Sequence, residues 1–361
     1  MAPETKALPP GSVVRLVGDD GVPQGVWHFN PHSLIAARRL DRDPGMVVGE
    51  GWFRARIAAA LALRERLFDA PFYRLVHAEA DGLPGLVIDR YGDTVVLQAN
   101  TAGMEAATPH IVAALHELLA PTTIVARNDS GVRALEMLPL ETVRLHGDAS
   151  RAWAEEGGLR FPIDLDAGQK TGWFHDQREH RARVAALAQG ATVLDAFCHT
   201  GGFGLQAAAH GAVAVTLLDA SQHALDLAME AAAAAGLADR VTPRRADAME
   251  DLPRIEGQFD IVIVDPPAFA KARKDNPAAL RAYGKLARIA AARVAPGGFL
   301  FIASCSHHVA SGEFADAVLW GALRVKRDAR ILHQGGAGPD HPLHPMLPES
   351  AYLKAMLLQF P

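Results

Sequence analysis

The fold is decided by the stretch VLDAFCHTGGFG, which runs from residue 193 to residue 204. Its apolar first half predicts a strand that ends at Asp195, and a loop with Gly201 and Gly202 then opens a helix at 204–210. Strands and helices alternate around this stretch. We predict strands at 192–195, 214–218, 241–245, 259–264 and 299–303, and further helices at 178–188, 221–235, 278–294 and 313–323. This alternation is typical of a parallel, doubly wound α/β sheet.

The residues before this sheet are organised differently. Short strands are predicted at 12–17, 25–29 and 34–40, a helix at 50–68, strands at 73–78, 86–89, 94–99 and 123–127 with a helix at 104–119, and a hairpin at 151–165. We therefore expect a small β module at 1–48, a linker helix and an α+β middle domain at 49–165, and a Rossmann-like domain at 166–361.

Composition narrows the class of protein. The chain has 361 residues and a net charge of −5, which argues against a nucleic-acid binder that uses its whole surface but allows a local basic patch. No apolar run is long enough to span a bilayer and residues 1–11 lack a signal-peptide pattern, so we expect a cytoplasmic protein with no membrane partner. Two cysteines, Cys198 and Cys305, cannot form a disulfide framework or a four-sulfur metal site, and we expect no metal. The oligomeric state stays open, a homodimer included.

Acidic residues follow four consecutive strands of the predicted sheet. They are Asp195, Asp219, Asp247 and Asp265. One acid after a strand is often only a helix cap, but four in succession at the ligand-binding edge of such a sheet are hard to explain that way. The loop after Asp195 lacks the early glycines of a dinucleotide fingerprint, and an acid there suits a cationic, amino-acid-like ligand better than a phosphate. Together with Asp219 as a ribose acceptor, this favours S-adenosylmethionine (SAM) over NAD.

At this point the chain resembles the class I SAM-dependent methyltransferases, in particular the bacterial 23S rRNA (cytosine-C5) methyltransferase family with a PUA-type N-terminal domain. The resemblance rests on NPHS at 30–33, QKTGWFHDQR at 169–178, the stretch at 193–203, DPPAF at 265–269, SCS at 304–306 and PESAYLK at 348–354. Family members usually begin with a longer PUA domain, so the module at 1–48 is expected to be a truncated, PUA-like one, and its RNA-docking role is open.

The resemblance implies roles for individual residues at the cofactor. Asp195 and the Gly201-Gly202 loop are expected to hold the methionine part, Asp219 the ribose and Asp247 the adenine. The expected cofactor-binding set is completed by side chains that close over the cofactor or line its loops, which are Phe174, Gln177, Arg178, Phe197 and Ala248.

Methylation at carbon 5 of cytosine requires a nucleophile, because a thiolate must first add to carbon 6 before carbon 5 can take up a methyl group. Cys305 follows a predicted strand beside the Asp265 loop and is the expected nucleophile. Cys198 lies inside the cofactor loop and is expected to be an inert, buried residue, which is also the alternative for Cys305. Asp265 could contact the N3/N4 edge of the cytosine or, alternatively, the amino group of SAM.

The substrate side of the site is predicted around the DPPAF stretch. Pro266 and Pro267 stiffen the loop, and Phe269 either stacks on a flipped base or packs within the loop. The RNA backbone is expected to meet a basic group made of Lys271, Arg273 and Lys274. The predicted partner is 23S rRNA. The alternatives are an rRNA guanine methyltransferase of the same fold, which needs no thiol, and a non-catalytic RNA-binding or assembly factor.

Overall fold

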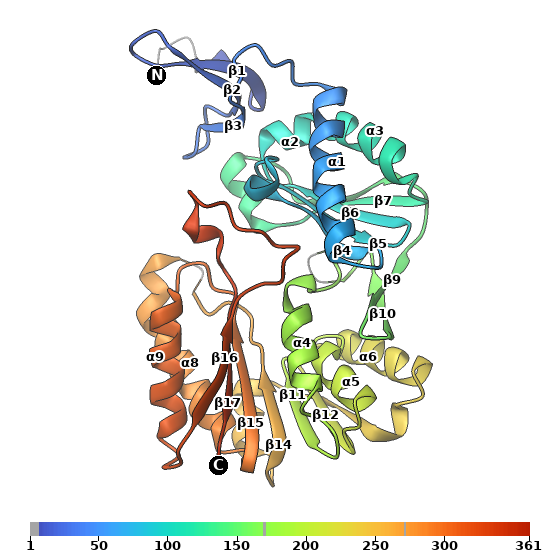
Figure 1. Cartoon of the computed structure of the whole chain (residues 1–361), viewed down its shortest axis with the longest axis vertical. Helices are drawn as coiled ribbons and strands as arrows, with labels where there is room; N and C mark the ends of the chain where they lie inside the picture. Colours follow the sequence, from blue (N-terminus) through green and yellow to red (C-terminus); the bar gives the residue numbers. More distant parts are fainter. Residues whose placement is uncertain (1–6, 169–170, 271) are drawn as a thin grey trace. The chain divides into compact units, whose positions relative to one another are not determined.

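The computed structural model describes residues 7–168, 171–270 and 272–361 (Figure 1), so Lys271 lies outside the described residues. The described chain forms two compact units. Unit 1 consists of the chain up to Ala154 together with Ile163–His175 and Pro339–His344. Unit 2 consists of Glu155–Pro162, Asp176–Gly338 and Pro345–Pro361. Each unit is therefore assembled from segments that are distant in the sequence.

Unit 1 begins with a three-stranded antiparallel sheet. Its strands follow in sequence order as β1 (Ser12–Val17), β2 (Pro23–Phe29) and β3 (Ala37–Asp41). Helix α1 (Glu50–Leu67) comes next and buries Phe53, Ile57 and Leu61 on one face. These three positions recur at helical spacing, which is why the sequence predicts both the helix and its buried side.

A five-stranded sheet forms the rest of unit 1. Its order is β4 (Phe72–His77), β5 (Leu86–Tyr91), β6 (Thr94–Ala99), β7 (Thr123–Asn128) and β8 (Glu141–His146). Strands β6 and β7 are parallel, and the chain between them forms α2 (Ala102–Ala106) and α3 (Thr108–Leu119). The sequence predicted one helix here and missed β8. The helix breaks because Pro109 stands in the first turn of α3, where its missing N–H costs nothing.

Unit 2 is built on a seven-stranded sheet with the order β13-β12-β11-β14-β15-β17-β16. The strands are β11 (Thr192–Ala196), β12 (Ala214–Asp219), β13 (Val241–Arg245), β14 (Phe259–Val264), β15 (Val294–Ser304), β16 (Arg330–Gly335) and β17 (Lys354–Gln359). The first five are parallel, as predicted, but β17 runs antiparallel to both β15 and β16. The connection from β16 to β17 contains no crossover helix, and so the chain returns in the opposite direction.

Helices cover both faces of this sheet. The helices are α4 (Arg178–Ala185), α5 (Gly202–Ala209), α6 (Gln222–Ala234), α7 (Ala248–Asp251), α8 (Asn276–Ala291) and α9 (Ser311–Leu323). Figure 1 shows α8 and α9 on one side of the sheet and α4, α5 and α6 on the other. This is the doubly wound, Rossmann-like arrangement that the alternation of strands and helices predicts. The predicted hairpin is present as β9 (Arg151–Glu156) and β10 (Leu159–Asp164).

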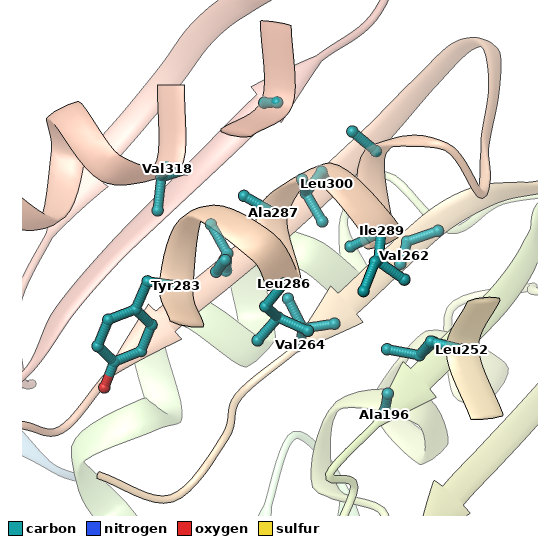
Figure 2. Close-up of a cluster of buried hydrophobic side chains, with 14 of the residues drawn as sticks. Ala196, Leu252, Val262, Val264, Tyr283, Leu286, Ala287, Ile289, Leu300 and Val318 are labelled. Atoms are coloured by element: carbon teal, nitrogen blue, oxygen red, sulfur yellow. The ribbon is translucent and has the colours of Figure 1, made fainter. Parts of the chain in front are cut away.

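The core of unit 2 lies between α8 and the middle of the sheet. In Figure 2 the α8 residues Tyr283, Leu286 and Ala287 lie beside Val264 of β14 and Leu300 of β15, and all five are almost completely buried. This packing holds the carboxyl ends of β14 and β15 in place. Among the described residues, none of the helices is both long and apolar enough to cross a membrane.

Candidate functional site at the carboxyl edge of the unit 2 sheet

Four of the predicted site residues lie at one edge of the sheet. Asp219 ends β12, Asp195 is the second-last residue of β11, Asp265 directly follows β14, and Cys305 directly follows β15. The strands pair in register, with Ala196 opposite both Leu218 and Val264. The order of the strands therefore brings residues that are distant in the sequence into one row, as expected for a ligand site in a doubly wound sheet.

The loop after β11 has an unusual backbone. Phe197 and His199 have φ angles of 60° and 51°, and Gly201 has a φ angle of 76°. Residues other than glycine rarely adopt this left-handed backbone conformation. Backbone strain of this kind is concentrated at functional sites. Helix α5 begins at Gly202, two residues before the predicted start, and its first N–H groups face the same edge of the sheet.

The Asp195 carboxyl is buried and surrounded by other acids. Its Oδ2 accepts a hydrogen bond of 2.8 Å from the Gly204 N–H, and the residue is 1% exposed. Burial, and then the charges of Asp265 and Asp219, raise the pKa of Asp195 to about 8, against the lowering effect of the Gly204 N–H. A buried carboxyl with two further acids nearby is suited to a cationic ligand. The residues present therefore fit the amino group of SAM.

The Asp219 carboxylate is held by the backbone on both oxygens. Oδ2 accepts from the His199 N–H at 2.9 Å, and Oδ1 accepts from the Ser221 N–H at 2.8 Å. These bonds tie the end of β12 to the loop that follows β11. Each carboxylate oxygen can accept a second hydrogen bond, so the predicted role toward ribose hydroxyls fits the geometry and stays a prediction.

The predicted adenine side of the site lies at the start of α7. Asp247 is exposed, and its Oδ1 accepts from the N–H groups of Met249 at 2.8 Å and Glu250 at 3.2 Å. It is thus the N-cap of α7, and contact with adenine remains a prediction that Oδ2 would have to satisfy. Ala248 is the first residue of that helix and is 4% exposed.

The Gln177 side chain is hydrogen-bonded to Asp265. Its Nε2 donates to Asp265 Oδ2 at 2.9 Å, and its Oε1 lies 2.7 Å from Nδ1 of the buried His180. Burial lowers the pKa of His180 to about 4, so this imidazole is neutral near pH 7, and its Nδ1–H orients the Gln177 amide. The chain His180–Gln177–Asp265 therefore fixes the acid that follows β14.

The other two residues predicted to close over the cofactor have different surroundings. Nε of Arg178 lies 3.9 Å from Oε2 of Glu156, whose carboxylate is also paired with Arg181 at 2.6 Å. Phe174 belongs to unit 1, whereas Gln177 and Arg178 belong to unit 2. A role of Phe174 and Arg178 at the cofactor stays a prediction.

The two cysteines differ in burial. Cys198 is buried, and burial together with the charges of Asp195 and Asp219 raises the pKa of its thiol well above the ordinary value. Such a thiol is not ionised near neutral pH and is inert. Cys305 is partly exposed at the edge of the sheet and so meets the accessibility that a nucleophile needs.

The DPPAF loop packs against α8 at one point. The rings of Phe269 and Tyr283 lie 4.7 Å apart, and Phe269 is half-buried, so packing within the protein accounts for part of its environment. Pro266 is buried and Pro267 is exposed, while Arg273 and Lys274 are exposed on the segment that follows. Across the described ranges, no group of three or more His, Cys, Asp or Glu side chains is arranged to hold a metal ion.

Sequence reasoning missed the two side chains that bond to Ser304 and Ser306, the neighbours of Cys305. Lys354 begins β17, is 4% exposed, and donates from Nζ to the carbonyl of Ser306. Tyr283 OH bonds to Ser304 Oγ at 2.8 Å and to Ser306 Oγ at 2.9 Å. The one available signal was that Lys354 closes the PESAYLK stretch, but its partner could not be read without the pairing of β15 and β17.

Comparison with known proteins identifies the family to which the chain belongs. The family model described as S-adenosylmethionine-dependent methyltransferase matches residues 112–359, and a PUA-like domain model matches residues 1–42. The protein is therefore a SAM-dependent methyltransferase with a PUA-like N-terminal domain. It is 37% identical to a ribosomal RNA large subunit methyltransferase I from Shewanella amazonensis, over 96% of this chain and 90% of that protein. It is 39% identical to a ribosomal RNA large subunit methyltransferase from Deinococcus radiodurans, over 92% and 84%. The chain belongs to this family of bacterial ribosomal RNA large subunit methyltransferases.

Solved structures agree at the level of the fold. A putative methyltransferase complexed with SAH superposes with a TM-score of 0.83 at 21% identity, covering 97% of this chain and 92% of that one. A putative SAM-dependent methyltransferase from Streptococcus mutans gives a TM-score of 0.81, also at 21% identity, over 97% of this chain and 92% of that one. The expectation of SAM rather than NAD is confirmed by the family.

Proposed function

We propose that this enzyme methylates carbon 5 of a cytosine in 23S rRNA through a covalent bond between Cys305 and carbon 6. The observation that carries the proposal is the position of Cys305, a partly exposed thiol next to the Asp265 loop on the strand beside β14. The relatives act, by their names, on the RNA of the large ribosomal subunit, which supports the substrate class.

The residues of the chain have separate roles in the proposed reaction. The Cys305 thiolate gives its electron pair to carbon 6, and the pyrimidine ring electrons shift toward N3, so that carbon 5 becomes nucleophilic. SAM, when bound by Asp195, Asp219 and the loop between them, supplies the methyl group that carbon 5 takes up. A base, either water or a side chain, then removes the carbon 5 proton, the carbon 5–carbon 6 double bond re-forms, and the bond from carbon 6 to sulfur breaks with its electron pair returning to Cys305.

Asp265 is proposed to act on the base during these steps. A hydrogen bond between its carboxyl and the N3/N4 edge would favour a proton on N3 while carbon 6 is attacked. Its Oδ2 is already oriented by Gln177, which leaves the direction of the carboxyl fixed before the substrate arrives. Pro266 and Pro267 hold the loop on the other side.

RNA binding is proposed to use the segment after the DPPAF loop, where Arg273 and Lys274 are exposed and Lys271 lies just before them. Exposed cations there would contact phosphates without reading sequence. The target cytosine must leave its stack to reach Cys305, and we propose that Phe269 stacks on it there.

The test is methylation of purified 23S rRNA with labelled SAM, followed by digestion and nucleoside analysis. We expect 5-methylcytidine, and we expect a covalent protein–RNA adduct on denaturing gels with RNA that carries 5-fluorocytidine at the target. A methylated guanine would instead identify the enzyme as a guanine methyltransferase, and an absence of methyl transfer with intact RNA binding would identify a binding or assembly factor.

A further inference from the structure

A buried lysine lies beside the proposed nucleophile. Strand β17 pairs antiparallel with β15, which places Lys354 opposite Ser304, the residue directly before Cys305. The Lys354 side chain is almost completely buried, and its Nζ donates to the carbonyl oxygen of Ser306, the residue directly after Cys305. Two elements that are about fifty residues apart in sequence therefore hold an amine next to the peptide that carries the thiol.

Among the described residues, the ammonium group of Lys354 has no carboxylate partner. In the described part of the chain, no carboxylate lies within ion-pair distance of Nζ, and the contact with the Ser306 carbonyl supplies only a dipole. Burial lowers the pKa of Lys354 to about 8, and a charge on Cys305 raises it. A buried ammonium is costly unless an anion is near, and the titratable group that counters the burial effect is the Cys305 thiol.

We propose that Lys354 is a positioning residue that holds Cys305 as the reactive thiolate. The inference rests on the proposed function, because it assigns a partner to the proposed nucleophile. Cys305 loses its proton to solvent, and the thiolate is stabilised by the Lys354 ammonium, which keeps its own proton throughout. When the bond from sulfur to carbon 6 breaks, the electron pair returns to sulfur beside the same ammonium, so that both the attack and the departure of the thiolate are favoured.

The other titratable groups around the thiol do not supply this charge. Tyr283, from α8, has its hydroxyl bonded to Ser304 and Ser306, and burial raises its pKa, so that it stays neutral; Figure 2 shows the ring and hydroxyl of this residue. His307 follows Cys305, and its Nδ1 lies 3.5 Å from the Glu349 carbonyl oxygen while its ring packs against Tyr352. Asp265, after β14, is an acid and would disfavour a thiolate.

The test measures the thiol itself, in the full-length protein without RNA. The rate at which iodoacetamide alkylates Cys305 is followed from pH 6 to pH 10 by peptide mass spectrometry, which separates Cys305 from Cys198. In the wild type we expect a midpoint below the usual cysteine pKa of about 8.5. In Lys354→Met we expect the midpoint to rise by about one pH unit or more, which lowers the alkylation rate at pH 7 about tenfold.

Three controls keep the test specific. Lys354→Arg keeps the charge and is expected to restore most of the low midpoint, whereas Lys326→Met removes an exposed lysine of the same unit and should leave it unchanged. Thermal unfolding shows whether each variant is folded. An equal midpoint in wild type and folded Lys354→Met would overturn the proposal. Because alkylation needs neither RNA nor SAM, a shifted midpoint without 5-methylcytidine formation would refute the proposed function and leave the lysine–thiol pair standing.

Discussion

Asp195 is an acid whose surroundings oppose its charge. The sequence marks it as the end of a strand and the start of the cofactor loop, but its burial, its bond to Gly204 and the nearby Asp219 and Asp265 appear only when the strands are assembled. With a pKa raised to about 8, the free enzyme at pH 7 carries Asp195 mostly protonated. A cationic ligand beside Asp195 would instead favour the ionised carboxylate.

Binding of the product S-adenosylhomocysteine is therefore expected to release a proton. Below about pH 8 the proton on Asp195 must leave before the carboxylate can face the ligand's amino group, so affinity should increase with pH, by up to tenfold per unit between pH 6 and 8 for one proton released. Calorimetry at three pH values, in buffers of different ionisation enthalpy, measures the affinity and the number of protons released on binding. Asp195→Asn should bind more weakly and without this pH dependence, and a wild-type affinity that is flat across this range would contradict the assignment.

Replacing Cys305 separates chemistry from binding. Cys305→Ala should lower the rate of methyl transfer by about 10³-fold or more while the affinity for S-adenosylhomocysteine stays within twofold, because in the proposed mechanism the thiol acts only on the base. Cys198→Ala is the matched control. Its thiol is buried and its pKa is raised, so we expect it to take no part in the reaction, with a stability loss of about 1 kcal/mol at most and methyl transfer retained. Equal methyl-transfer rates of Cys305→Ala and Cys198→Ala would contradict the proposed covalent bond between Cys305 and the cytosine.

At the residue scale, the sequence predicts where the candidate residues lie in the sheet better than it predicts their contacts. Asp265 and Cys305 are recognisable from their positions after strands and from the short stretches around them. The bond from Gln177 to Asp265 joins residues that are 88 positions apart, and no local pattern encodes it. Lys354 is missed for the same reason, since only the pairing with Ser304 reveals it.

At the scale of elements, α8 and α9 pack through a contact between backbones. A Cβ atom added to Gly321 would lie 2.1 Å from the carbonyl oxygen of Gly284, and one added to Gly284 would lie 3.1 Å from the carbonyl oxygen of Ala317. The two helices cover the core of unit 2, shown in Figure 2, and hold the edge of the sheet that carries Cys305. Glycine is required here for close approach rather than for an unusual φ angle.

Two glycines of the same helix give a matched pair of variants. Gly321→Ala should destabilise the protein by about 1–3 kcal/mol, because backbone atoms cannot move aside for the new methyl group. Gly312→Ala, in the first turn of α9 with no atom within 4 Å of the new Cβ, should be neutral or stabilising by up to about 1 kcal/mol. Urea unfolding of both variants measures the difference, and equal stabilities would show that the helices adjust their spacing.

Sequence periodicity predicts most elements but not their direction. The alternation in residues 178–323 correctly yields the five parallel strands, but the short helix α7 between β13 and β14 is not predicted. The antiparallel β17 escapes this reasoning because its direction depends on a long connection without a helix. Strand β8 escapes because most of its side chains are exposed, so that Glu141–His146 lacks the apolar signal of a buried strand.

At the scale of the whole molecule, unit 1 depends on a segment from near the end of the chain. Pro339–His344 is part of unit 1, and Asp340 is 1% exposed there. Its Oδ2 accepts from the Arg74 N–H at 3.0 Å, its Oδ1 lies 2.8 Å from His341 Nδ1, and its carbonyl oxygen accepts from Arg64 at 3.0 Å. Arg64 is itself paired with both oxygens of Asp81 at 2.7 Å. A buried polar network thus holds this segment.

Removing one charge from this network should be costly and pH-dependent. Burial would raise the pKa of Asp340, but the His341 hydrogen bond, the nearby positive charges and the Arg74 N–H together hold it well below its ordinary range. Because the folded-state pKa is depressed, Asp340 contributes stability above about pH 4, and that contribution is lost as the pH falls further. Asp340→Asn should therefore lose about 3 kcal/mol at pH 7, and its difference from the wild type should shrink below pH 4.

Urea titrations at pH 7 and pH 3.5 measure both effects. Asp19→Asn, at an exposed aspartate of unit 1, is the control and should change stability by less than about 0.5 kcal/mol at either pH. A difference between wild type and Asp340→Asn that does not depend on pH would show that the segment is held by shape and not by charge.

The place of Pro339–His344 in unit 1 also sets an order for events on the translating ribosome. The residues of unit 1 up to Ala154 are synthesised long before the segment Pro339–His344, which completes their buried polar network. Arg64 can pair with Asp81 as soon as both have been made, but the bonds from Arg64 and Arg74 to Asp340 can form only after residue 340 has been synthesised. A polypeptide that stops before Pro339 therefore lacks part of the buried polar network of the unit that is made first.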